Sequence, residues 1–209
     1  MANTKVSALA AAGSFLTADE IPVNEAGTSK KVTGTQMATF FGYRKLDVQT
    51  TASAASLTLT VPAGTYLRLL IDFIGRSDQA GAQLLQGQFN TDVGATYYTQ
   101  YSSVTNATRT ENAPSITANQ GIMGSCGLTG AVAGAIAAYS IEIHNADSTT
   151  LRKNWSFTGG HWNSDVAGGA VTITGQGQWN NTANAITSIK LFPAAGNLIT
   201  ARAILYGQL

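Results

Sequence analysis

Two histidines are the first residues to consider for metal or acid–base chemistry. His144 falls on the polar face of a predicted strand, and His161 falls in the segment Gly159-Gly160-His161-Trp162-Asn163, which is typical of a turn. A zinc site usually combines several His or Cys ligands at short, regular spacing. The two histidines are far apart, and the sequence has no His-x-His or His-x-x-x-His spacing. We therefore predict surface or turn roles for both residues and no metal site.

The segment Gly124-Ser125-Cys126-Gly127 is the best candidate for a nucleophile. It superficially resembles the Gly-x-Ser-x-Gly elbow, in which a strained strand-to-helix turn exposes a serine. The spacing differs from that motif, and no strand-to-helix pattern surrounds it. The glycines instead favour a tight loop, and they do not form a dinucleotide-binding fingerprint because no βαβ pattern encloses them.

Paired carboxylates would be needed for glycoside hydrolysis. Four of the acids in the main part of the chain fall in turn-like segments, where Asp commonly bonds to nearby backbone. Asp72 is expected to point outward from its strand, opposite Leu70 and Ile71. We therefore predict that the protein is not an enzyme and has no catalytic residue, cofactor or metal. The acids considered are Asp72, Asp78, Asp92, Glu142, Asp147 and Asp165.

Six aromatic residues have two interpretations that the sequence leaves open. They could form a patch on which sugars stack, or they could pack in the core or at a subunit interface. The residues are Trp155, Trp162, Trp179, Tyr97, Tyr98 and Tyr101.

The composition indicates one β-rich domain with an appendage. The chain has 209 residues, of which 44% are hydrophobic, only 11% are charged and 22 are glycine, and its net charge is +1. The basic pairs Lys30-Lys31 and Arg152-Lys153 do not make a nucleic-acid footprint. Cys126 is the single cysteine, so no intrachain disulfide is expected. We see no secretion signal in residues 1–12 and no membrane span, and expect synthesis in a cytoplasm.

Alternating apolar and polar residues from Tyr43 onward predict an all-β domain, residues 42–209. Leu57, Leu59 and Val61 share one face, for example. About eight to ten strands separated by Gly, Asn and Pro are typical of an antiparallel β-sandwich, and we predict a jelly-roll-like one. Residues 105–134 are expected to form a long loop, with a short strand near 121–125. The strands are expected at 56–61, 65–75, 83–90, 96–104, 135–145, 150–158, 170–179, 185–192 and 198–206.

Residues 1–41 are predicted to form an N-terminal attachment arm. Residues 20–23 and 29–33 can pair as a hairpin around a turn at 24–28, and a short helix can follow at 34–41. The apolar side chains of this arm are too few to form a core, so they need the surface of a partner. The expected partner-binding residues are Phe15, Leu16, Ile21, Pro22, Val23, Lys30, Lys31, Val32, Met37, Phe40 and Phe41.

The arm resembles the N-terminal attachment segment of tailed-bacteriophage structural proteins. The matching residues are Glu20-Ile21-Pro22-Val23, Gly27-Thr28 and Lys30-Lys31-Val32-Thr33. Residues 88–97 are similar to a Phe-Asn-x-Asp-x-Gly-x-x-Tyr hairpin of virion β-domains. Residues 186–191 and the ending Ala203-Ile204-Leu205-Tyr206-Gly207 resemble the closing strands of such domains.

The resemblance implies a virion structural protein on the outer surface of the particle and no catalytic residues. Because no fibre repeat follows the β-domain in this sequence, we expect a capsid decoration (cement) protein or short head fibre, assembled as a homotrimer. Its partner would be the major capsid protein or another virion protein, with no nucleic acid or membrane bound. The alternative is a tail-fibre or adsorption component that binds host glycan.

Overall fold

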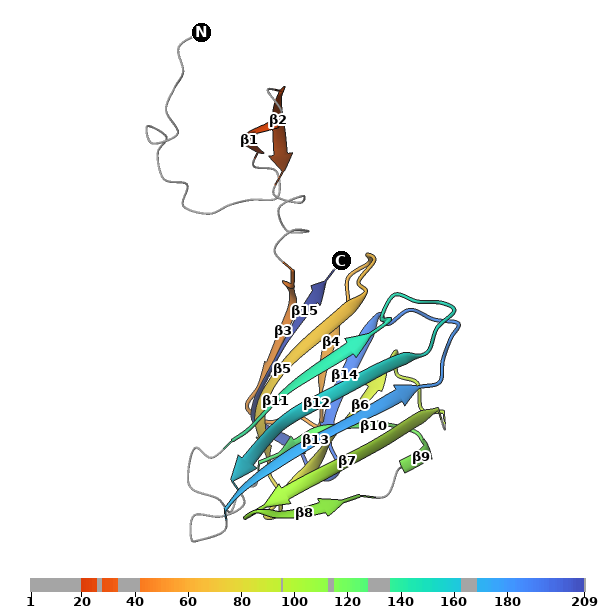
Figure 1. Ribbon diagram of the computed structural model, residues 1–209. Helices are drawn as coiled ribbons and strands as arrows, with labels where there is room; N and C mark the ends of the chain where they lie inside the picture. Colours follow the sequence, from red (N-terminus) through yellow and green to blue (C-terminus); the bar gives the residue numbers. More distant parts are fainter. Residues whose placement is uncertain are drawn as a thin grey trace, which may run out of the picture. The chain divides into compact units, whose positions relative to one another are not determined.

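The structure is a computed structural model that describes residues 20–25, 28–33, 42–94, 96–112, 115–127, 136–162 and 169–208. The chain divides into two compact units, Met1–Gly42 and Tyr43–Leu209. In the first unit, β1 (Glu20–Glu25) and β2 (Thr28–Thr33) form an antiparallel hairpin (Figure 1). The predicted hairpin is therefore present, whereas the helix predicted at 34–41 lies outside the described residues.

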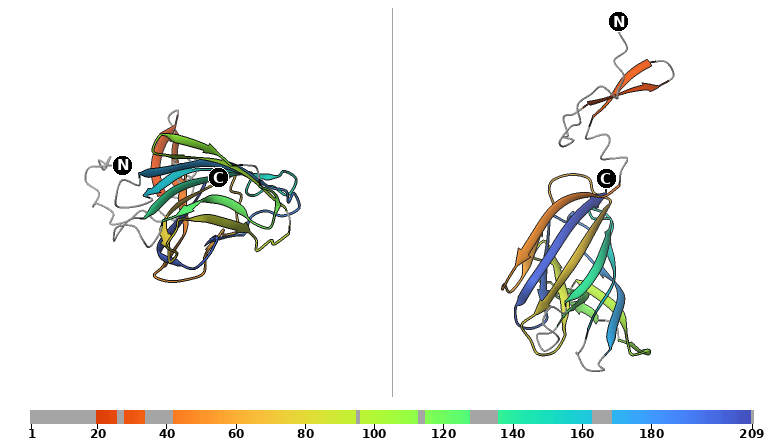
Figure 2. Two further views of the ribbon diagram at one scale, coloured as in Figure 1. Left: turned by 90° about the horizontal axis from the view of Figure 1, so that it is seen from below. Right: turned by 90° about the vertical axis from the view of Figure 1, so that its left-hand side faces the viewer.

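The second unit is an all-β sandwich. Among the residues that the structure describes, its strands form a large nine-stranded sheet and a small four-stranded sheet, and the left view of Figure 2 shows the two layers. The strands are β3 (Arg44–Thr51), β4 (Leu57–Thr60), β5 (Arg68–Ser77), β6 (Gln83–Phe89), β7 (Tyr97–Thr105), β8 (Thr108–Glu111), β9 (Ser115–Ala118), β10 (Gly121–Cys126), β11 (Ala137–His144), β12 (Lys153–Trp162), β13 (Ala170–Trp179), β14 (Ser188–Pro193) and β15 (Leu198–Gln208).

The strand order confirms the predicted jelly roll. Eight of the strands pair as the nested set β3·β15, β4·β14, β5·β11 and β6·β10, as if one long hairpin were rolled up. The nested pairs alternate between the sheets, which gives the order β3-β15-β5-β11 in the large sheet and β4-β14-β6-β10 in the small sheet. Such crossing of strands between two antiparallel sheets defines the jelly-roll class.

Two insertions widen the large sheet beyond the jelly roll. The hairpin of β12 and β13 follows β11, and β7 with its edge strands β8 and β9 pairs to β13 (Figure 1). The large sheet therefore continues from β11 through β12 and β13 to β7, and presents a broad outer face to solvent.

The alternation predicted from sequence is visible in the burial of these strands. In β11, Tyr139, Ile141 and Ile143 are buried, and Ser140 and Glu142 lie on the other face. In β4, Leu57 and Leu59 are buried between exposed threonines. A strand that covers a core on one face requires this period of two, because successive side chains point to opposite faces.

Four aromatic rings fill the core where the inserted strands join the jelly roll. The ring of Phe89 lies 5.6 Å from that of Trp155 and 5.4 Å from that of Trp179, and Tyr97 lies 6.3 Å from Trp179. All four are at most 1% exposed. These residues therefore support the core interpretation of the aromatics.

The predicted Phe-Asn-x-Asp-x-Gly-x-x-Tyr hairpin is wrong, because the two strands that flank its turn do not pair. β6 belongs to the small sheet and β7 to the large sheet, so residues 90–96 carry the chain between sheets. Asn90 and Thr91 turn the chain with φ angles of 53° and 56°, and Asp92 accepts a hydrogen bond of 2.7 Å from the indole N–H of Trp179. The turn predicted at residues 91–94 is present, but the sequence pattern does not indicate that β7 belongs to a different sheet from β6.

Four further strands differ from the sequence interpretation. β3 is not among the expected strands. The predicted loop at 105–134 contains two unexpected edge strands, β8 and β9. It also contains β10, which matches the strand expected near 121–125. β12 continues four residues past its predicted end, to Trp162. The Gly159-Gly160 pair is typical of a turn, but both glycines lie within β12.

Candidate ligand-binding face

The outer face of the large sheet carries two adjacent rows of polar side chains. Strand register places Ser140 opposite Thr158, Thr158 opposite Thr174, and Thr174 opposite Ser102. The hydroxyl oxygens of Ser102 and Thr174 are 3.5 Å apart. The second row, by the same registers, is Glu142, Ser156, Gln176 and Gln100. We call these eight residues the polar rows.

The polar rows line a hollow of about 500 Å³, which Leu70, Glu111 and the β13 backbone at Gly175 complete. A second hollow of about 390 Å³ shares Gln100 and Gln176 with the first, and adds Tyr98, Asn154 and Gln178. Gln178 donates to Asn154 over 2.9 Å and accepts from Arg152 over 3.0 Å. The two hollows therefore form one continuous surface across β11, β12, β13 and β7.

Two acids that line the first hollow, Glu142 and Glu111, are paired, and Asp72 lies opposite Ser140 at the end of the first row. Glu142 accepts hydrogen bonds from Arg68 at 3.3 Å and from the Tyr43 hydroxyl at 3.1 Å. Burial, followed by the hydrogen bond and charge of Glu142, raises the pKa of Tyr43. Glu111 forms an ion pair with Arg109. No Lys or Arg is among the described residues that line either hollow, so the face offers mainly hydroxyl and amide groups.

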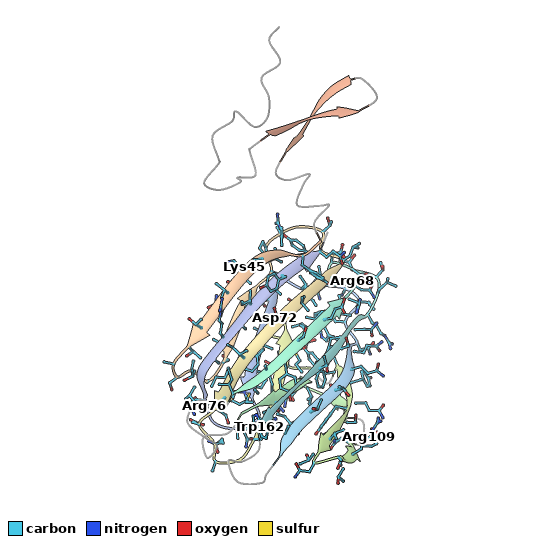
Figure 3. All side chains as sticks on the ribbon, turned by 60° about the vertical axis from the view of Figure 1, so that its left-hand side comes forward. Lys45, Arg68, Asp72, Arg76, Arg109 and Trp162 are labelled. Atoms are coloured by element: carbon cyan, nitrogen blue, oxygen red, sulfur yellow. The ribbon has the colours of Figure 1, made fainter. Side chains whose placement is uncertain are left out.

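Trp162 stands at one end of the same face, at the end of β12 away from Arg68 (Figure 3). Its side chain is 57% exposed. It borders a further hollow of about 270 Å³ that Ile136, Gly160 and Thr172 also line. Gly160 is required by close packing, because a Cβ there would lie 2.5 Å from the Val171 carbonyl oxygen. The bare backbone at Gly160 leaves the floor of the hollow open beside the indole ring.

The aromatic residues are thus divided between two roles. Trp155, Trp179 and Tyr97 are in the core, and Tyr101 packs partly against it. Tyr98 and Trp162 line hollows on the outer face. The sugar-stacking patch of all six aromatics is therefore wrong, and only these two fit such a surface.

His161 does not lie in a surface turn as predicted but in the interior, where it joins a polar network. Its Nδ1 is 2.7 Å from the Ser125 hydroxyl, which is 2.9 Å from the Tyr139 hydroxyl. Burial lowers the pKa of His161 and raises that of Tyr139 to about 12. Ser125 is 2% exposed and His161 is 7% exposed. A serine and a histidine at this distance could act as nucleophile and base, but their burial favours a hydrogen-bonded bridge between β10 of the small sheet and β11 and β12 of the large sheet.

Two of the acids considered for hydrolysis accept backbone hydrogen bonds. The carboxylate of Asp78 accepts the Asn197 backbone N–H at 2.9 Å, and that of Asp92 accepts the Gly94 N–H at 2.8 Å. Asp72 and Leu70 both lie on the outer face, since Leu70 pairs with Glu142 and Asp72 with Ser140. Leu70 therefore shares a face with Asp72, contrary to the prediction, and only Ile71 is opposite. Asp165 lies outside the described residues.

Within the described ranges, no group of three or more His, Cys, Asp or Glu side chains could hold a metal ion. The described part of the chain also contains no long apolar helix of the kind that crosses a membrane.

The predicted partner-binding residues lie in the N-terminal unit. The hairpin register brings six of them together as facing pairs, Ile21 with Val32, Pro22 with Lys31, and Val23 with Lys30. The other five lie outside the described residues, namely Phe15, Leu16, Met37, Phe40 and Phe41.

The comparisons with known proteins assign no family to this chain. No protein-family model and no curated protein matches the chain. Among solved structures, the chain is similar to an exo-inulinase from Aspergillus awamori, with a TM-score of 0.34 and 11% identity. The match covers 91% of this chain but 34% of that enzyme. The chain thus spans about a third of the enzyme's length.

Proposed function

We propose that this chain is a non-catalytic structural protein of a tailed-bacteriophage virion, and specifically a trimeric capsid decoration or cement protein. The proposal rests on the division of the chain into a small N-terminal unit and a sandwich with its own core. The N-terminal unit carries the residues that resemble a virion attachment segment. The sandwich is displayed on the outer surface, and the N-terminal unit binds the major capsid protein or another virion protein.

The physical properties of a two-stranded hairpin support attachment through the N-terminal unit. A two-stranded hairpin is marginally stable in water by itself. Each edge of such a hairpin has free backbone donors and acceptors, so it gains stability when it adds to the exposed edge of a partner's sheet. The paired strands Glu20–Glu25 and Thr28–Thr33 are of this type.

Binding of this kind would stabilise the capsid through linkage. A ligand that binds only the assembled shell lowers the free energy of that shell and not of its separated subunits. Virions that lack the protein should then lose tolerance to heat and to internal DNA pressure.

Deletion of residues 2–41 tests the proposal. The truncated chain should keep the unfolding midpoint and circular dichroism of the intact sandwich, because the hydrophobic core formed by the described residues lies in residues 57–205. It should fail to bind stripped virions in a sedimentation assay that the full chain passes. Retained virion binding by a folded, truncated chain would refute attachment through this unit. Equal heat tolerance of stripped and decorated virions would refute the cement role.

A second candidate is an adsorption component that binds host glycan. The two large hollows of the outer face, which no described Lys or Arg lines, and the exposed Trp162 favour this candidate. Labelling of the protein on intact virions separates the two functions, because a decoration protein covers the head and an adsorption protein is confined to the tail.

A further inference from the structure

We infer that the outer face of the large sheet binds a neutral glycan chain, with Trp162 as the stacking surface and the polar rows as the hydrogen-bonding surface. This inference concerns the sandwich unit and does not depend on attachment through residues 1–42. It assigns a ligand class to a surface that the decoration role leaves unused.

The first argument is the exposed apolar strip around Trp162. Strand register aligns Ile74, Ala138, Gly160, Thr172 and Val104 across five strands next to it. Ile74 is 39% exposed and Val104 is 37% exposed, while Trp162 itself is 57% exposed. Ile74 and Val104 lie at the two ends of this row, whereas Ile136, which is 38% exposed, lines the same hollow as Trp162. Large apolar side chains that gather on a surface commonly mark a binding site. A flat indole ring beside an open floor suits the apolar face of a sugar ring, and its N–H remains available to a hydroxyl.

The second argument is the chemistry of the polar rows. Each Ser and Thr hydroxyl both donates and accepts, and each Gln amide does so with separate atoms. Neighbouring strands lie about 4.8 Å apart, so Ser140, Thr158, Thr174 and Ser102 recur at about that interval across the sheet, and the hydroxyl oxygens of Thr174 and Ser102 approach to 3.5 Å. A regular series of such groups matches a ligand that presents hydroxyl groups repeatedly along its length.

The third argument is charge, and it separates a neutral glycan from other ligands. A nucleic acid or an acidic polysaccharide requires Lys or Arg that contact the anionic groups. The residues that line the two large hollows include neither, and the acid Glu142 is already bonded to Arg68. Arg68 and Arg109 are already paired with Glu142 and Glu111, and Asp72 lies opposite Ser140 at the end of the first row. An acidic chain would therefore find no unpaired Lys or Arg among the described residues that line the two hollows, so a neutral chain fits best.

The apolar strip and the polar rows are parts of one surface. Gly160 and Thr158 lie two residues apart on β12, and Thr172 and Thr174 lie two apart on β13, all on the outer face. A glycan chain stacked on Trp162 can therefore continue across Thr158 and Thr174 to Gln176 and Gln100.

The test uses the full chain and an array of neutral and acidic oligosaccharides built from glucose, galactose, mannose, N-acetylhexosamines and uronic acids. Binding to at least one neutral sugar series is expected, followed by calorimetric titration with that oligosaccharide. Trp162→Ala should weaken binding about tenfold or more, the loss typical of a truncated aromatic anchor. Thr158→Val combined with Gln176→Ala should weaken it as well.

Leu151→Ala is the matched control, since Leu151 is likewise 57% exposed but lies in the turn before β12. This control should bind like the parent, and binding should change little between low and high salt because the ligand is neutral.

Several results would overturn the inference. These are absence of binding to every neutral oligosaccharide, equal binding by the Trp162→Ala and parent chains, or salt-sensitive binding to uronic acids alone. Self-association that Trp162→Ala abolishes would instead identify a second copy as the occupant. Because the array uses the isolated protein, its failure would leave virion attachment through residues 1–42 standing, and the deletion experiment would test that attachment separately.

Discussion

Replacement of Gly177 by alanine tests how the large sheet is held together beneath its outer face. Gly177 on β13 pairs with Trp155 on β12, and its missing side chain makes room for the indole ring. A Cβ at Gly177 would lie 2.1 Å from Trp155 Cζ2 and 2.4 Å from Cε2. Carbon atoms pack at about 3.5–4.0 Å, so the ring or the strand would have to move by more than about 1 Å.

The ring has little freedom to move. It packs edge-on against Phe89 at 5.6 Å and lies 6.2 Å from Tyr97, and its indole N–H donates to the Ile122 carbonyl at 3.0 Å. Overpacking of a core typically costs about 1–3 kcal/mol, and loss of this hydrogen bond adds about 1 kcal/mol. We therefore expect Gly177→Ala to lower the free energy of unfolding by about 3 kcal/mol.

A loss of that size should be visible in thermal unfolding. For a domain of this length, 1 kcal/mol corresponds to about 2–4 °C, so the expected fall in Tm is about 6–12 °C. Tryptophan fluorescence is a suitable probe because Trp155, Trp162 and Trp179 all lie in the sandwich. Gly81→Ala is the control, since a Cβ at Gly81 meets nothing within 4 Å. The packing argument fails if the Gly177→Ala chain melts within about 2 °C of the Gly81→Ala chain.

Two other predictions concern polar groups in the sandwich. Asp92→Ala should destabilise it by about 1–3 kcal/mol in chemical denaturation, because the buried Trp179 N–H loses its acceptor; a change as small as that of Asp72→Ala on the exposed face would contradict this. Burial by itself would raise the pKa of Asp92, but bonds from Gly94, Trp179 and Thr96 outweigh it and lower the pKa; the stability that these bonds contribute should therefore be present above pH 3.8 and be lost as the pH falls through the folded-state value. Burial lowers the pKa of His161 below 6.5. As the pH falls below 6.5, the imidazole therefore takes up a proton in the unfolded chain before it does so in the folded chain. The free energy of unfolding should then decrease by up to about 1.4 kcal/mol for each unit by which the pH falls, until the folded-state pKa is reached. His161→Gln should remove this slope, and an unchanged slope below pH 6.5 would show that another group causes it.

The sequence by itself determined the fold class and most of the strands. The alternation in Tyr139, Ile141 and Ile143 depends only on neighbours along the chain, because the period of two follows from local backbone geometry. Turn residues such as Asn90 and Asp92 were likewise recognisable, because their side chains bond to nearby backbone. These features depend only on residues that are close together in the sequence, so they can be predicted without the tertiary structure.

The phase of β12 could also have been predicted. Counting in twos from the buried Trp155 places Phe157, Gly159 and His161 inward and Ser156, Thr158, Gly160 and Trp162 outward, as observed. The pair Gly159-Gly160 hid this pattern, since glycines are usually read as a turn. Here they stay in the strand because a Cβ at Gly159 would lie 2.1 Å from the Ala138 carbonyl oxygen, a neighbour visible only in three dimensions.

Only the tertiary structure decided which strands share a sheet and which side chains share a surface. The polar rows draw on β11, β12, β13 and β7, and Ser125 meets His161 across 36 positions of sequence. Such contacts are set by the nested strand pairing of the jelly roll and by its inserted strands. Pairing between distant strands depends on the burial of both sheets together, which no window of local sequence contains.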